Sequence, residues 1–375
     1  MPGPDDGAAA VLSIDLTAIV ANYRLLVARL GGAECAGVVK ADAYGLGVAE
    51  VAPALHGAGC RVFFVATLDE GIELRGLLPE AEIYVFNGLT AGGVESFVAH
   101  ALRPVLNSLG EIDAWAAMGR RRGPLAAALH IDTGMARLGL PPAEVAALAE
   151  DRFRLDGAAV ALMLSHLACA DEPEHPMNAR QLAAFRDAVR RVAPDGARLS
   201  LAASSGIFLG ADYRFDVARP GAALYGLRPQ PDAPNPLAPV VRLQGKILQV
   251  RDVDSDTTVG YGATHRCTRP ARLATVGAGY AYGYLRSLSN RGSAHIGAER
   301  VPVVGRVSMD LITLDVTAIA PERVTPGALV DLIGPHNPVD ALAEEAGTIG
   351  YEILTSLGRR YRRRYVGAAA PVAGG

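Results

Sequence analysis

Short runs of aliphatic and β-branched residues alternate with stretches rich in alanine and leucine from about residue 11 to residue 230. The short runs are typical of strands. A stretch such as Leu16–Leu30 carries apolar residues at helical spacing, with Ser13 or Asp15 as a cap at its start and Gly31 and Gly32 as a stop. The predicted strands are Ala36–Lys40, Val62–Thr67, Ile83–Asn87, Pro104–Asn107, Ala126–Asp132, Val160–His166, Leu199–Ala203 and Asp216–Arg219. Eight strand-then-helix units in roughly 200 residues or more are what a (β/α)8 barrel requires, and a doubly wound sheet is the alternative that the strand count leaves open.

A proline-rich segment ends this alternation. The stretch PQPDAPNPLAP, residues 229–239, contains five prolines and is incompatible with regular strand pairing. Beyond it, stretches such as Val240–Val253 and Ala328–Gly334 alternate apolar and polar residues and predict a smaller, mostly β domain. The predicted fold class is therefore α/β, with an N-terminal (β/α)8 TIM-like barrel over residues 11–236 and a C-terminal mostly-β domain over residues 237–368.

Composition excludes several classes of protein. The chain has 375 residues and a formal net charge of −3, which disfavours nucleic acid as the main partner. Its four cysteines are not spaced as zinc ligands or as a disulfide framework, which indicates reduced thiols. The first residues lack the pattern of a signal peptide, and no apolar run reaches the ~18 residues of a membrane span. We expect a cytoplasmic protein with no metal site and no membrane or nucleic-acid partner.

Lysine is almost absent from the sequence. The 36 lysine and arginine residues include only two lysines, Lys40 and Lys246. A chain that uses arginine almost everywhere retains lysine where arginine cannot replace it, as in imine chemistry. Lys40 ends the first predicted strand, and active sites of (β/α)8 barrels lie at the C-terminal ends of the strands. The sequence therefore predicts a functional role for Lys40.

Other predicted strands also end in polar residues. These are Tyr44 just after Lys40; His130, Asp132 and Arg137 after the fifth strand; Ser165 and His166 at the sixth; Ser204 and Ser205 at the seventh; and Arg219 and Gly221 at the eighth. Any one of them is as readily an ordinary capping or loop residue. Five strands that bring such groups to one rim favour a binding site.

The residue types at this rim suit pyridoxal phosphate. Lys40 can form an imine with the cofactor aldehyde, and Tyr44, Ser204 and the backbone around Gly221 supply hydrogen-bond donors for its phosphate. Arg219 has only donors and stays protonated, so against a pyridine nitrogen it can bond only the unprotonated form. A ring held in that form is a weaker electron sink, and reprotonation at Cα then competes well against transamination.

Eight motifs in order resemble bacterial alanine racemase, a pyridoxal-phosphate-dependent family of fold type III, along nearly the whole chain. In the barrel they are VVKADAYGLG, IDTGMARLG, SHLACAD and RPGAALYG; in the second domain they are VGYGATH, VGAGYAYGYLR, VGRVSMD and YEILTSLGRR. One such motif is a weak signal, but the ordered set is a strong one. The resemblance implies an isomerase that interconverts L-alanine and D-alanine and supplies D-alanine for peptidoglycan.

The resemblance also implies two bases, one on each face of the α-carbon, as inversion requires. Lys40 would hold the cofactor and then remove the α-proton of the D-amino acid, and Tyr261 would deprotonate the L-amino acid. Each base needs a pKa near neutrality, for tyrosine a drop from about 10, to which a cationic neighbour such as Arg137 would contribute. In the family this tyrosine reaches the barrel of the other subunit, which implies a head-to-tail homodimer with shared active sites.

The remaining site residues follow from the same resemblance. Arg137 and the backbone N–H of Met309 would hold the substrate carboxylate, and Tyr280 and Asp310 would line the path of the substrate. The cofactor would be bound by Tyr44, Ser204, Gly221, Ala222 and Tyr351 around the phosphate, and by His166 and Arg219 around the ring.

Three positions depart from the family pattern. His130 stands where many members have a lysine that becomes carbamylated and supports the carboxylate-binding arginine. Tyr282 replaces an aspartate and is expected to make the substrate path bulkier and less acidic, and Ala203 stands where asparagine is usual. These departures leave open a broader racemase that also accepts, for instance, serine.

Two other classes of pyridoxal-phosphate-binding protein are alternatives to a racemase. A decarboxylase of the same architecture would pair the pyridine nitrogen with a carboxylate, so Arg219 disfavours it. A small single-barrel protein that binds pyridoxal phosphate without catalysis would lack the second domain, so Tyr261 and the segment from residue 240 onward disfavour it.

Overall fold

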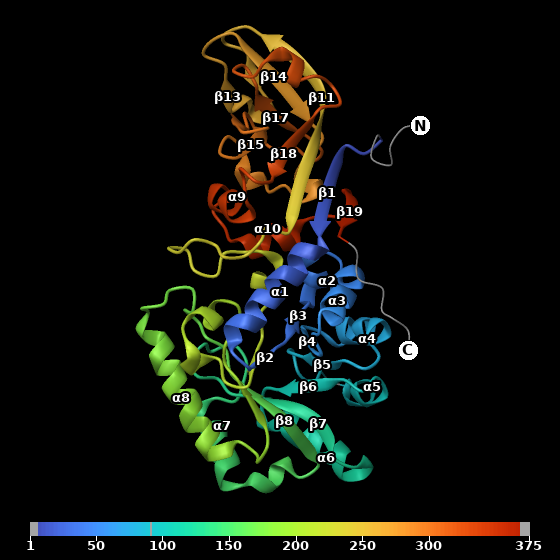
Figure 1. The fold of residues 1–375 in the computed structure, drawn as a ribbon, viewed down its shortest axis with the longest axis vertical. Coiled ribbons are helices and arrows are strands. Elements are labelled where there is room, and N and C mark those ends of the chain that lie inside the picture. Colours follow the sequence, from blue (N-terminus) through green and yellow to red (C-terminus); the bar gives the residue numbers. More distant parts are fainter. Residues whose placement is uncertain (1–6, 91, 368–375) are drawn as a thin grey trace. The chain divides into compact units, whose positions relative to one another are not determined.

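The computed structural model describes residues 7–90 and 92–367 and divides into two compact units. One unit comprises Ile19–Ala238 (Figure 1). The other comprises, among the described residues, 7–18 and 239–367. The first unit contains the predicted alternation of strands and helices, and the second contains most of the antiparallel strands.

The strands of the first unit run parallel in the order of the sequence. The strands are β2 (Glu34–Cys35), β3 (Gly37–Val38), β4 (Val62–Val65), β5 (Glu82–Val85), β6 (Arg103–Leu106), β7 (Leu125–His130), β8 (Ala158–Leu164), β9 (Arg198–Ser200) and β10 (Val217–Ala218). Seven of them, β3 to β9, form one sheet, and β10 pairs with β2. All eight predicted strands are present, and most of them end one to three residues earlier than expected.

The two ends of this sheet are joined, which makes it a barrel. Val38 N–H donates to the carbonyl of Pro220 over 3.0 Å, so β10 continues alongside β3 as well as β2. On its other side, Ala203 and Arg219 form a parallel bridge between the extensions of β9 and β10. The predicted (β/α)8 barrel is thus confirmed over the doubly wound alternative.

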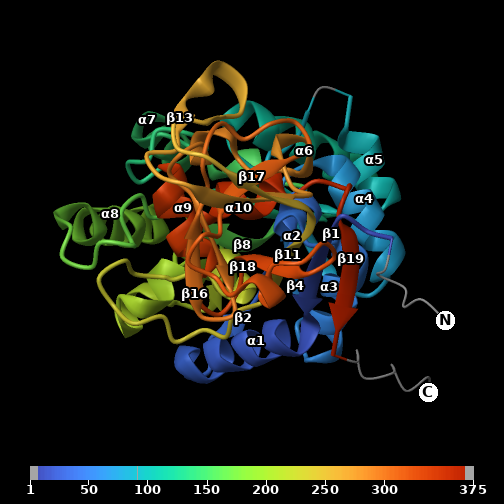
Figure 2. The same cartoon turned by 90° about the horizontal axis from the view of Figure 1, so that it is seen from above.

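Helices surround these strands (Figure 2). They are α1 (Leu16–Leu30), α2 (Lys40–Gly45), α3 (Val48–Gly57), α4 (Leu68–Leu77), α5 (Val94–Ala99), α6 (Leu109–Arg122), α7 (Pro142–Glu150) and α8 (Pro176–Val192), with short 3-10 helices η1 (Arg152–Leu155), η2 (Ser205–Phe208), η3 (Ala211–Tyr213) and η4 (Ala222–Tyr225). Asp15 caps α1 as expected, because its Oδ1 accepts the Ala18 N–H over 3.0 Å.

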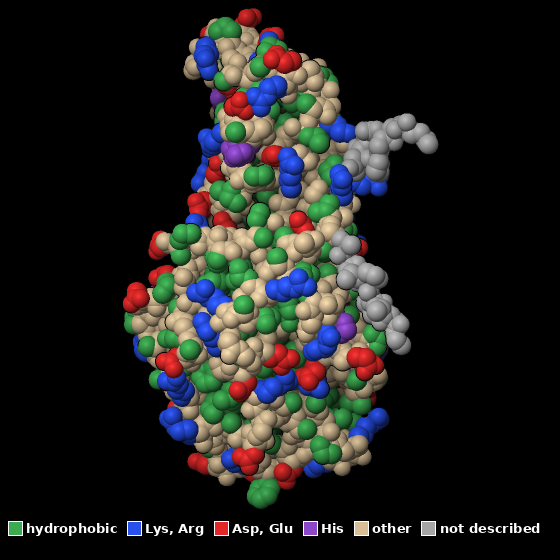
Figure 3. All heavy atoms as spheres, viewed as in Figure 1, with side chains coloured by type: hydrophobic (Ala, Val, Ile, Leu, Met, Phe, Trp, Pro, Cys, Tyr) green, Lys and Arg blue, Asp and Glu red, His purple; other side chains and the backbone are tan. Residues whose placement is uncertain are grey.

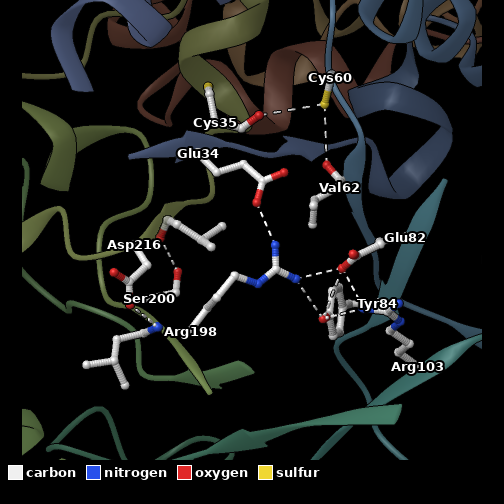
Figure 4. A network of polar contacts seen from close by, with 12 residues as sticks. Glu34, Cys35, Cys60, Val62, Glu82, Tyr84, Arg103, Arg198, Ser200 and Asp216 are labelled. Atoms are coloured by element: carbon white, nitrogen blue, oxygen red, sulfur yellow. Dashed lines mark hydrogen bonds and ion pairs between the residues drawn. The ribbon is translucent and has the colours of Figure 1, made fainter. Parts of the chain in front are cut away.

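A charged network occupies the N-terminal ends of the barrel strands, opposite the rim that carries Lys40. Arg198, the first residue of β9, donates to Glu34 of β2 over 2.5 Å and to Glu82 of β5 over 2.6 Å (Figure 4). Arg103 of β6 donates to the same Glu82 carboxylate over 2.5 Å and to the Tyr84 hydroxyl over 3.0 Å. The guanidinium of Arg198 therefore links strands from different parts of the barrel, at the end that usually serves stability.

The second unit is a mostly β domain, as predicted. It contains β1 (Ala10–Asp15), β11 (Val241–Val253), β12 (Thr258–Val259), β13 (His265–Arg266), β14 (Ala271–Val276), β15 (Ser293–Ile296), β16 (Glu299–Pro302), β17 (Ile312–Asp315), β18 (Leu329–Ile333) and β19 (Arg362–Val366), helices α9 (Val339–Ala346) and α10 (Gly350–Ser356), and 3-10 helices η5 (Tyr261–Ala263), η6 (Tyr280–Tyr282), η7 (Arg286–Leu288) and η8 (Pro321–Arg323). The main sheet has the order β16-β15-β18-β11-β1-β19, and β14 connects β11 to β17.

The first strand differs from the range 11–236 expected for the barrel. β1 pairs with β11 in antiparallel fashion, for example Leu12 with Leu243, and with β19 in parallel fashion. Leu12 and Ile14 are fully buried between these partners, whereas the barrel is already closed by β10 and β2. The end of the predicted second domain, residue 368, lies outside the described residues.

The surface carries both signs of charge. Basic and acidic side chains are interspersed over the face in Figure 3 rather than gathered by sign. Within the described ranges, no helix has the length and apolar character needed to cross a bilayer.

Removal of Arg198 is expected to destabilise the barrel unit. Arg198→Met leaves Glu34 and Glu82 without their shared cation, and we expect a loss of about 1–3 kcal/mol of unfolding free energy. Arg190→Met is the matched control, because its ion pair with Asp187 is well exposed and contributes about 0–1 kcal/mol. Urea unfolding followed by circular dichroism compares the two variants. Equal shifts of the midpoint would contradict a structural role for the network.

Candidate active site

Lys40 was predicted to end a strand, but it begins a left-handed turn instead. β3 stops at Val38, and the next four residues after Lys40 (Ala41, Asp42, Ala43 and Tyr44) all have φ between +52° and +57°. Such a conformation costs about 1–2 kcal/mol for each residue with a Cβ. The chain therefore adopts a strained backbone at the residue that the sequence marks as functional, a common property of active sites.

Hydrogen bonds hold this turn in place. Ala43 N–H donates to the Val39 carbonyl over 2.9 Å, and Asp42 accepts the Val48 N–H on Oδ1 over 2.7 Å. Ala41 N–H donates to a side chain from another helix, Glu70 Oε1 on α4, over 2.7 Å. The turn is thus fixed at its start and at its end, which sets the positions of Lys40 and Tyr44.

The environment of Lys40 favours its neutral amine. Burial lowers the pKa of Lys40, the Arg137 guanidinium lowers it further, and the Glu70 carboxylate opposes the shift. The ammonium nitrogen lies 5.8 Å from the centre of the Phe86 ring. A lowered pKa suits imine formation and proton abstraction, because both require an unprotonated amine.

Tyr44, Ser204 and Gly221 come together at the closing seam of the barrel. Ser204 Oγ accepts the N–H groups of Gly221 and Ala223, each over 3.1 Å. A hydroxyl accepts two hydrogen bonds and donates one, so the proton of Ser204 is left to donate elsewhere. The backbone N–H of Ala222, between these two donors, has no partner among the described residues. Together these groups offer donors to an anion.

Gly221 is required by the close approach of Tyr44. A Cβ at position 221 would lie 2.2 Å from the Tyr44 hydroxyl oxygen and 2.8 Å from Cζ of that ring. The Tyr44 ring has little room to move, since it packs 4.7 Å from the ring of Tyr225, whose hydroxyl donates to the Val38 carbonyl over 2.9 Å. Only glycine accommodates the tyrosine here.

Arg219 is a buried cation, only 2% exposed. One terminal nitrogen donates to Ser200 Oγ, and the other donates to the Ser165 carbonyl over 2.5 Å. Ser200 in turn donates its proton to the Val217 carbonyl over 2.5 Å, so its lone pairs face the guanidinium. Burial lowers the pKa of Arg219 to about 9, which leaves it protonated at neutral pH.

His166, next to Ser165, is neutral. Burial, followed by Arg219 and Arg137, lowers its pKa to about 3. Its backbone carbonyl accepts the side-chain amide of the buried Gln181 from α8 over 2.8 Å, and this amide also bonds Thr133 Oγ1 over 3.1 Å. The sequence analysis missed Gln181, because nothing in a helical pattern distinguishes one buried glutamine.

His130 has a defined tautomer. Burial lowers its pKa to about 3, and its Nδ1 lies 2.8 Å from Asn107 Oδ1. The Asn107 amide nitrogen donates to the carbonyls of Phe86 and Val105, so Oδ1 is the acceptor and His130 Nδ1 carries the proton. Nε2 of this neutral imidazole is therefore left with a lone pair. Asn107 was also missed by sequence reasoning.

Arg137 lies on an exposed loop that Asp132 organises. Oδ1 of Asp132 accepts the backbone N–H groups of Gly134 and Met135, each over 2.9 Å, and of Ala136 over 3.2 Å. Ala136 has a φ of +55°, and Arg137 follows it with an exposed side chain. Its charge lowers the pKa of both Lys40 and His166, so Arg137 shares their electrostatic environment.

The other predicted residues lie on neighbouring loops of the β unit. Tyr280 N–H donates to the Ser308 carbonyl over 3.1 Å, and Ala281 N–H to the Met309 carbonyl over 3.0 Å. The Met309 side chain is 53% exposed, and its N–H has no partner among the described residues. Tyr261 begins η5 and is 72% exposed; the next residue, Gly262, approaches the Arg306 side chain. Tyr351, on α10, is exposed.

Tyr282 is largely buried and packs against side chains of its own unit. It is 8% exposed, and its ring lies 5.3 Å from that of Tyr361 and 4.3 Å below the guanidinium of Arg360. Arg360 also donates to Asp310 Oδ1 over 2.6 Å. The tyrosine therefore serves as a platform for the arginine that holds Asp310.

The residues of the barrel rim fit pyridoxal phosphate. The hydroxyl proton of Ser204 and the N–H of Ala222 can donate to the phosphate. The amine of Lys40, whose pKa is lowered, can react with the aldehyde. Arg219 is held at the rim by Ser200 and Ser165. These donors and this amine are the chemistry that the cofactor needs.

Comparisons with known proteins match this architecture. The family model described as alanine racemase, N-terminal domain, matches residues 14–229, and the model of the alanine racemase C-terminal domain matches residues 240–365. An alanine racemase of Rhodospirillum rubrum is 52% identical over 368 residues, 97% of this chain and 98% of the relative. A catabolic alanine racemase of Mesorhizobium japonicum is 51% identical over 371 residues, 98% and 96% of the two chains.

Solved structures give the same result. The crystal structure of alanine racemase from Bartonella henselae with covalently bound pyridoxal phosphate has a TM-score of 0.92 and 41% identity, and the match covers 96% of this chain and 100% of that one. The biosynthetic alanine racemase of Pseudomonas aeruginosa has a TM-score of 0.88 and 35% identity, with 96% and 100% covered. The resemblance stated from the motifs is confirmed.

Gly221→Ala is expected to weaken cofactor binding about tenfold or more, because the added Cβ overlaps the Tyr44 hydroxyl. Gly76→Ala on α4 is the matched control, because a Cβ there meets no heavy atom within 4 Å. Titration of each apoprotein with pyridoxal phosphate, followed by the absorbance of the lysine-bound cofactor, measures the two affinities. Equal affinities would show that the seam does not hold the cofactor.

Proposed function

Because the chain belongs to the alanine racemase family, we propose that it interconverts L-alanine and D-alanine by removing and returning the α-proton on opposite faces of the substrate. The observation that carries this proposal is the seam of the barrel, where an amine with a lowered pKa, a set of anion donors and a buried arginine meet. Bound pyridoxal phosphate supplies an aldehyde for the amines of lysine and substrate and a ring that delocalises charge from Cα.

Lys40 serves one face of the substrate. Its amine would hold the cofactor through the aldehyde, and the neutral amine would take or return the α-proton of the D-enantiomer. The lowered pKa of Lys40 supports this role, since an ammonium group would be unable to accept a proton at neutral pH. Burial and Arg137 are the two principal causes of the shift.

Arg219 and His166 orient the cofactor ring without protonating it. Arg219 stays a cation and uses one N–H of each terminal nitrogen on Ser200 and Ser165, so it keeps further N–H groups that can donate to the pyridine nitrogen without protonating it. The imidazole of His166 is neutral and adds no charge beside the ring. This arrangement favours return of the proton to Cα over transamination, and a decarboxylase with a carboxylate at the pyridine nitrogen is correspondingly disfavoured.

Tyr261 serves the opposite face and belongs to a second subunit of a homodimer. Its high exposure supports this assignment, and Met309, Ile349 (61% exposed) and Tyr351 are exposed apolar or aromatic side chains on the same unit. Exposed apolar side chains mark an interface where they form one contiguous patch. Tyr261 would take the α-proton of L-alanine, and Tyr351 would join Tyr44, Ser204, Gly221 and Ala222 around the phosphate.

The substrate carboxylate is held by Arg137 and the Met309 N–H, and Tyr280 and Asp310 line the path that leads to them. The exposed guanidinium of Arg137 and the free N–H of Met309 support these roles. Alanine is the preferred substrate in this proposal. Serine is the second candidate, because the rim of this chain carries His130 and Ala203 in place of the residues that are usual in the family.

We propose that the D-alanine formed is used for peptidoglycan in the cytoplasm. The four cysteines are all free thiols, which supports a reducing compartment. Some relatives are named as catabolic alanine racemases, and a catabolic role is the alternative that growth on D-alanine would distinguish.

Tyr261→Phe is expected to abolish proton exchange on one face of the substrate α-carbon and to leave exchange on the other face. Racemisation falls by about 100-fold or more, since one base is lost, but Lys40 still exchanges the α-proton of D-alanine for solvent deuterium. Exchange from L-alanine is lost with racemisation. Proton NMR of each enantiomer in D2O measures both, and Tyr213→Phe, to which no role is assigned, is the control. Loss of exchange from both enantiomers, or from neither, would contradict the assignment of the two bases.

A further inference from the structure

Glu70 makes more contacts than its place in a helix requires. It is the third residue of α4, whose N-cap is Thr67. Thr67 Oγ1 accepts the Glu70 N–H over 3.3 Å, and Glu70 Oε2 accepts the N–H groups of Thr67 over 3.2 Å and Ala66 over 2.7 Å. This reciprocal arrangement is a capping box, and a single carboxylate oxygen suffices for it.

The second carboxylate oxygen leaves the capping box and reaches the Lys40 turn. Glu70 Oε1 accepts the N–H of Ala41 over 2.7 Å. That N–H belongs to the peptide bond directly after Lys40, and Ala41 is the first residue of the turn with a positive φ. The orientation of this peptide plane fixes ψ of Lys40 and φ of Ala41, and with them the direction in which the Lys40 side chain leaves the backbone.

The turn requires such an anchor because its own residues disfavour it. Ala41, Asp42, Ala43 and Tyr44 all carry a Cβ, and none is the glycine that a positive φ favours. The bond from Ala41 is charge-assisted and comes from a different helix, so it persists only while α4 is docked against the start of the turn. Asp42 makes the corresponding bond at the far end, to Val48 N–H, but from within the same segment.

We propose that Glu70 is a positioning residue for Lys40, which holds the left-handed turn so that the lysine amine is aimed at the cofactor aldehyde and at Cα of the substrate. This inference rests on the proposed racemase function and names a residue that acts through Lys40 rather than on the substrate. The negative charge of its carboxylate also raises the pKa of Lys40, which opposes the effect of Arg137 on that pKa. The sequence carries a signal for it in the capping box TLDE, Thr67 to Glu70.

The test compares two ways of breaking the capping box. Thr67→Ala removes the hydrogen bond from Glu70 N–H to Thr67 Oγ1 and leaves the bond from Ala41 N–H to the Glu70 carboxylate intact. Glu70→Ala removes the other half of the box, from Thr67 N–H to Glu70 Oε2, and also the bond from Ala41. Both variants are expected to lose thermal stability, and Glu70→Ala is expected to lose more, because its carboxylate accepts three N–H groups and the Thr67 hydroxyl accepts one. Only Glu70→Ala is expected to form the lysine-bound cofactor more slowly and to lower kcat by about 10- to 100-fold, with little change in KM.

A compensating change makes the test specific. Ala41→Gly removes the Cβ that disfavours the positive φ, so in the Glu70→Ala background it is expected to restore a large part of the rate of cofactor attachment and of kcat. In the wild-type background, where Glu70 already holds the turn, the same change is expected to raise neither rate. Glu70→Gln, which keeps one strong acceptor, is expected to fall between wild type and Glu70→Ala.

Two results would overturn the proposal. One is a Glu70→Ala variant whose cofactor attachment and kcat equal those of Thr67→Ala. The other is a loss in Glu70→Ala that Ala41→Gly does not reduce. Cofactor attachment is followed by absorbance and does not depend on the amino acid that the enzyme accepts. If wild type also left alanine unchanged, the proposed substrate would fail while the absorbance comparison still decided the role of Glu70.

Discussion

The backbone hydrogen bonds that β10 shares with β2, and the one from Val38 N–H to the Pro220 carbonyl, join the first and last strands of the barrel, and the whole rim of the site depends on them. Residues about 180 positions apart in the sequence meet along this seam, among them Tyr44 with Gly221 and Tyr225 with Val38. A barrel that failed to close would leave Lys40 on one edge of a sheet and the phosphate donors on the other. Closure of the barrel is therefore also assembly of the site.

The two ends of the barrel use charge in opposite ways. At the N-terminal ends of the strands, Arg103 and Arg198 are matched by Glu34 and Glu82, which serves stability (Figure 4). At the C-terminal ends, burial lowers the pKa of Lys40 and of His166, and the charge of Arg137 lowers both further. Arginines at this rim favour anions such as a phosphate and a carboxylate, and the same positive charge lowers the pKa of the lysine.

Much of this arrangement could be predicted from the sequence, because periodicity and strand order determine which residues meet at the rim. All eight strands, the second domain and the rim residues from Lys40 to Gly221 follow from such patterns. The left-handed turn could not be predicted, since Ala41 to Tyr44 contain no glycine and local propensity disfavours a positive φ. Asn107, Gln181 and the burial of Tyr282 were also missed, because they depend on tertiary contacts between distant segments. The strand β1 (Ala10–Asp15) was not predicted either, and its partners β11 and β19 come from segments far along the chain.

Subunit complementation tests directly whether each catalytic centre combines Lys40 of one subunit with Tyr261 of another, as we propose. Lys40→Ala and Tyr261→Phe proteins, each nearly inactive alone, are unfolded together in equal amounts and refolded with pyridoxal phosphate. Random pairing makes half of the dimers mixed, and each mixed dimer has one intact centre, so we expect about one quarter of wild-type racemase activity. Activity no greater than the sum of the separate variants, in a sample shown to contain mixed dimers, would contradict it.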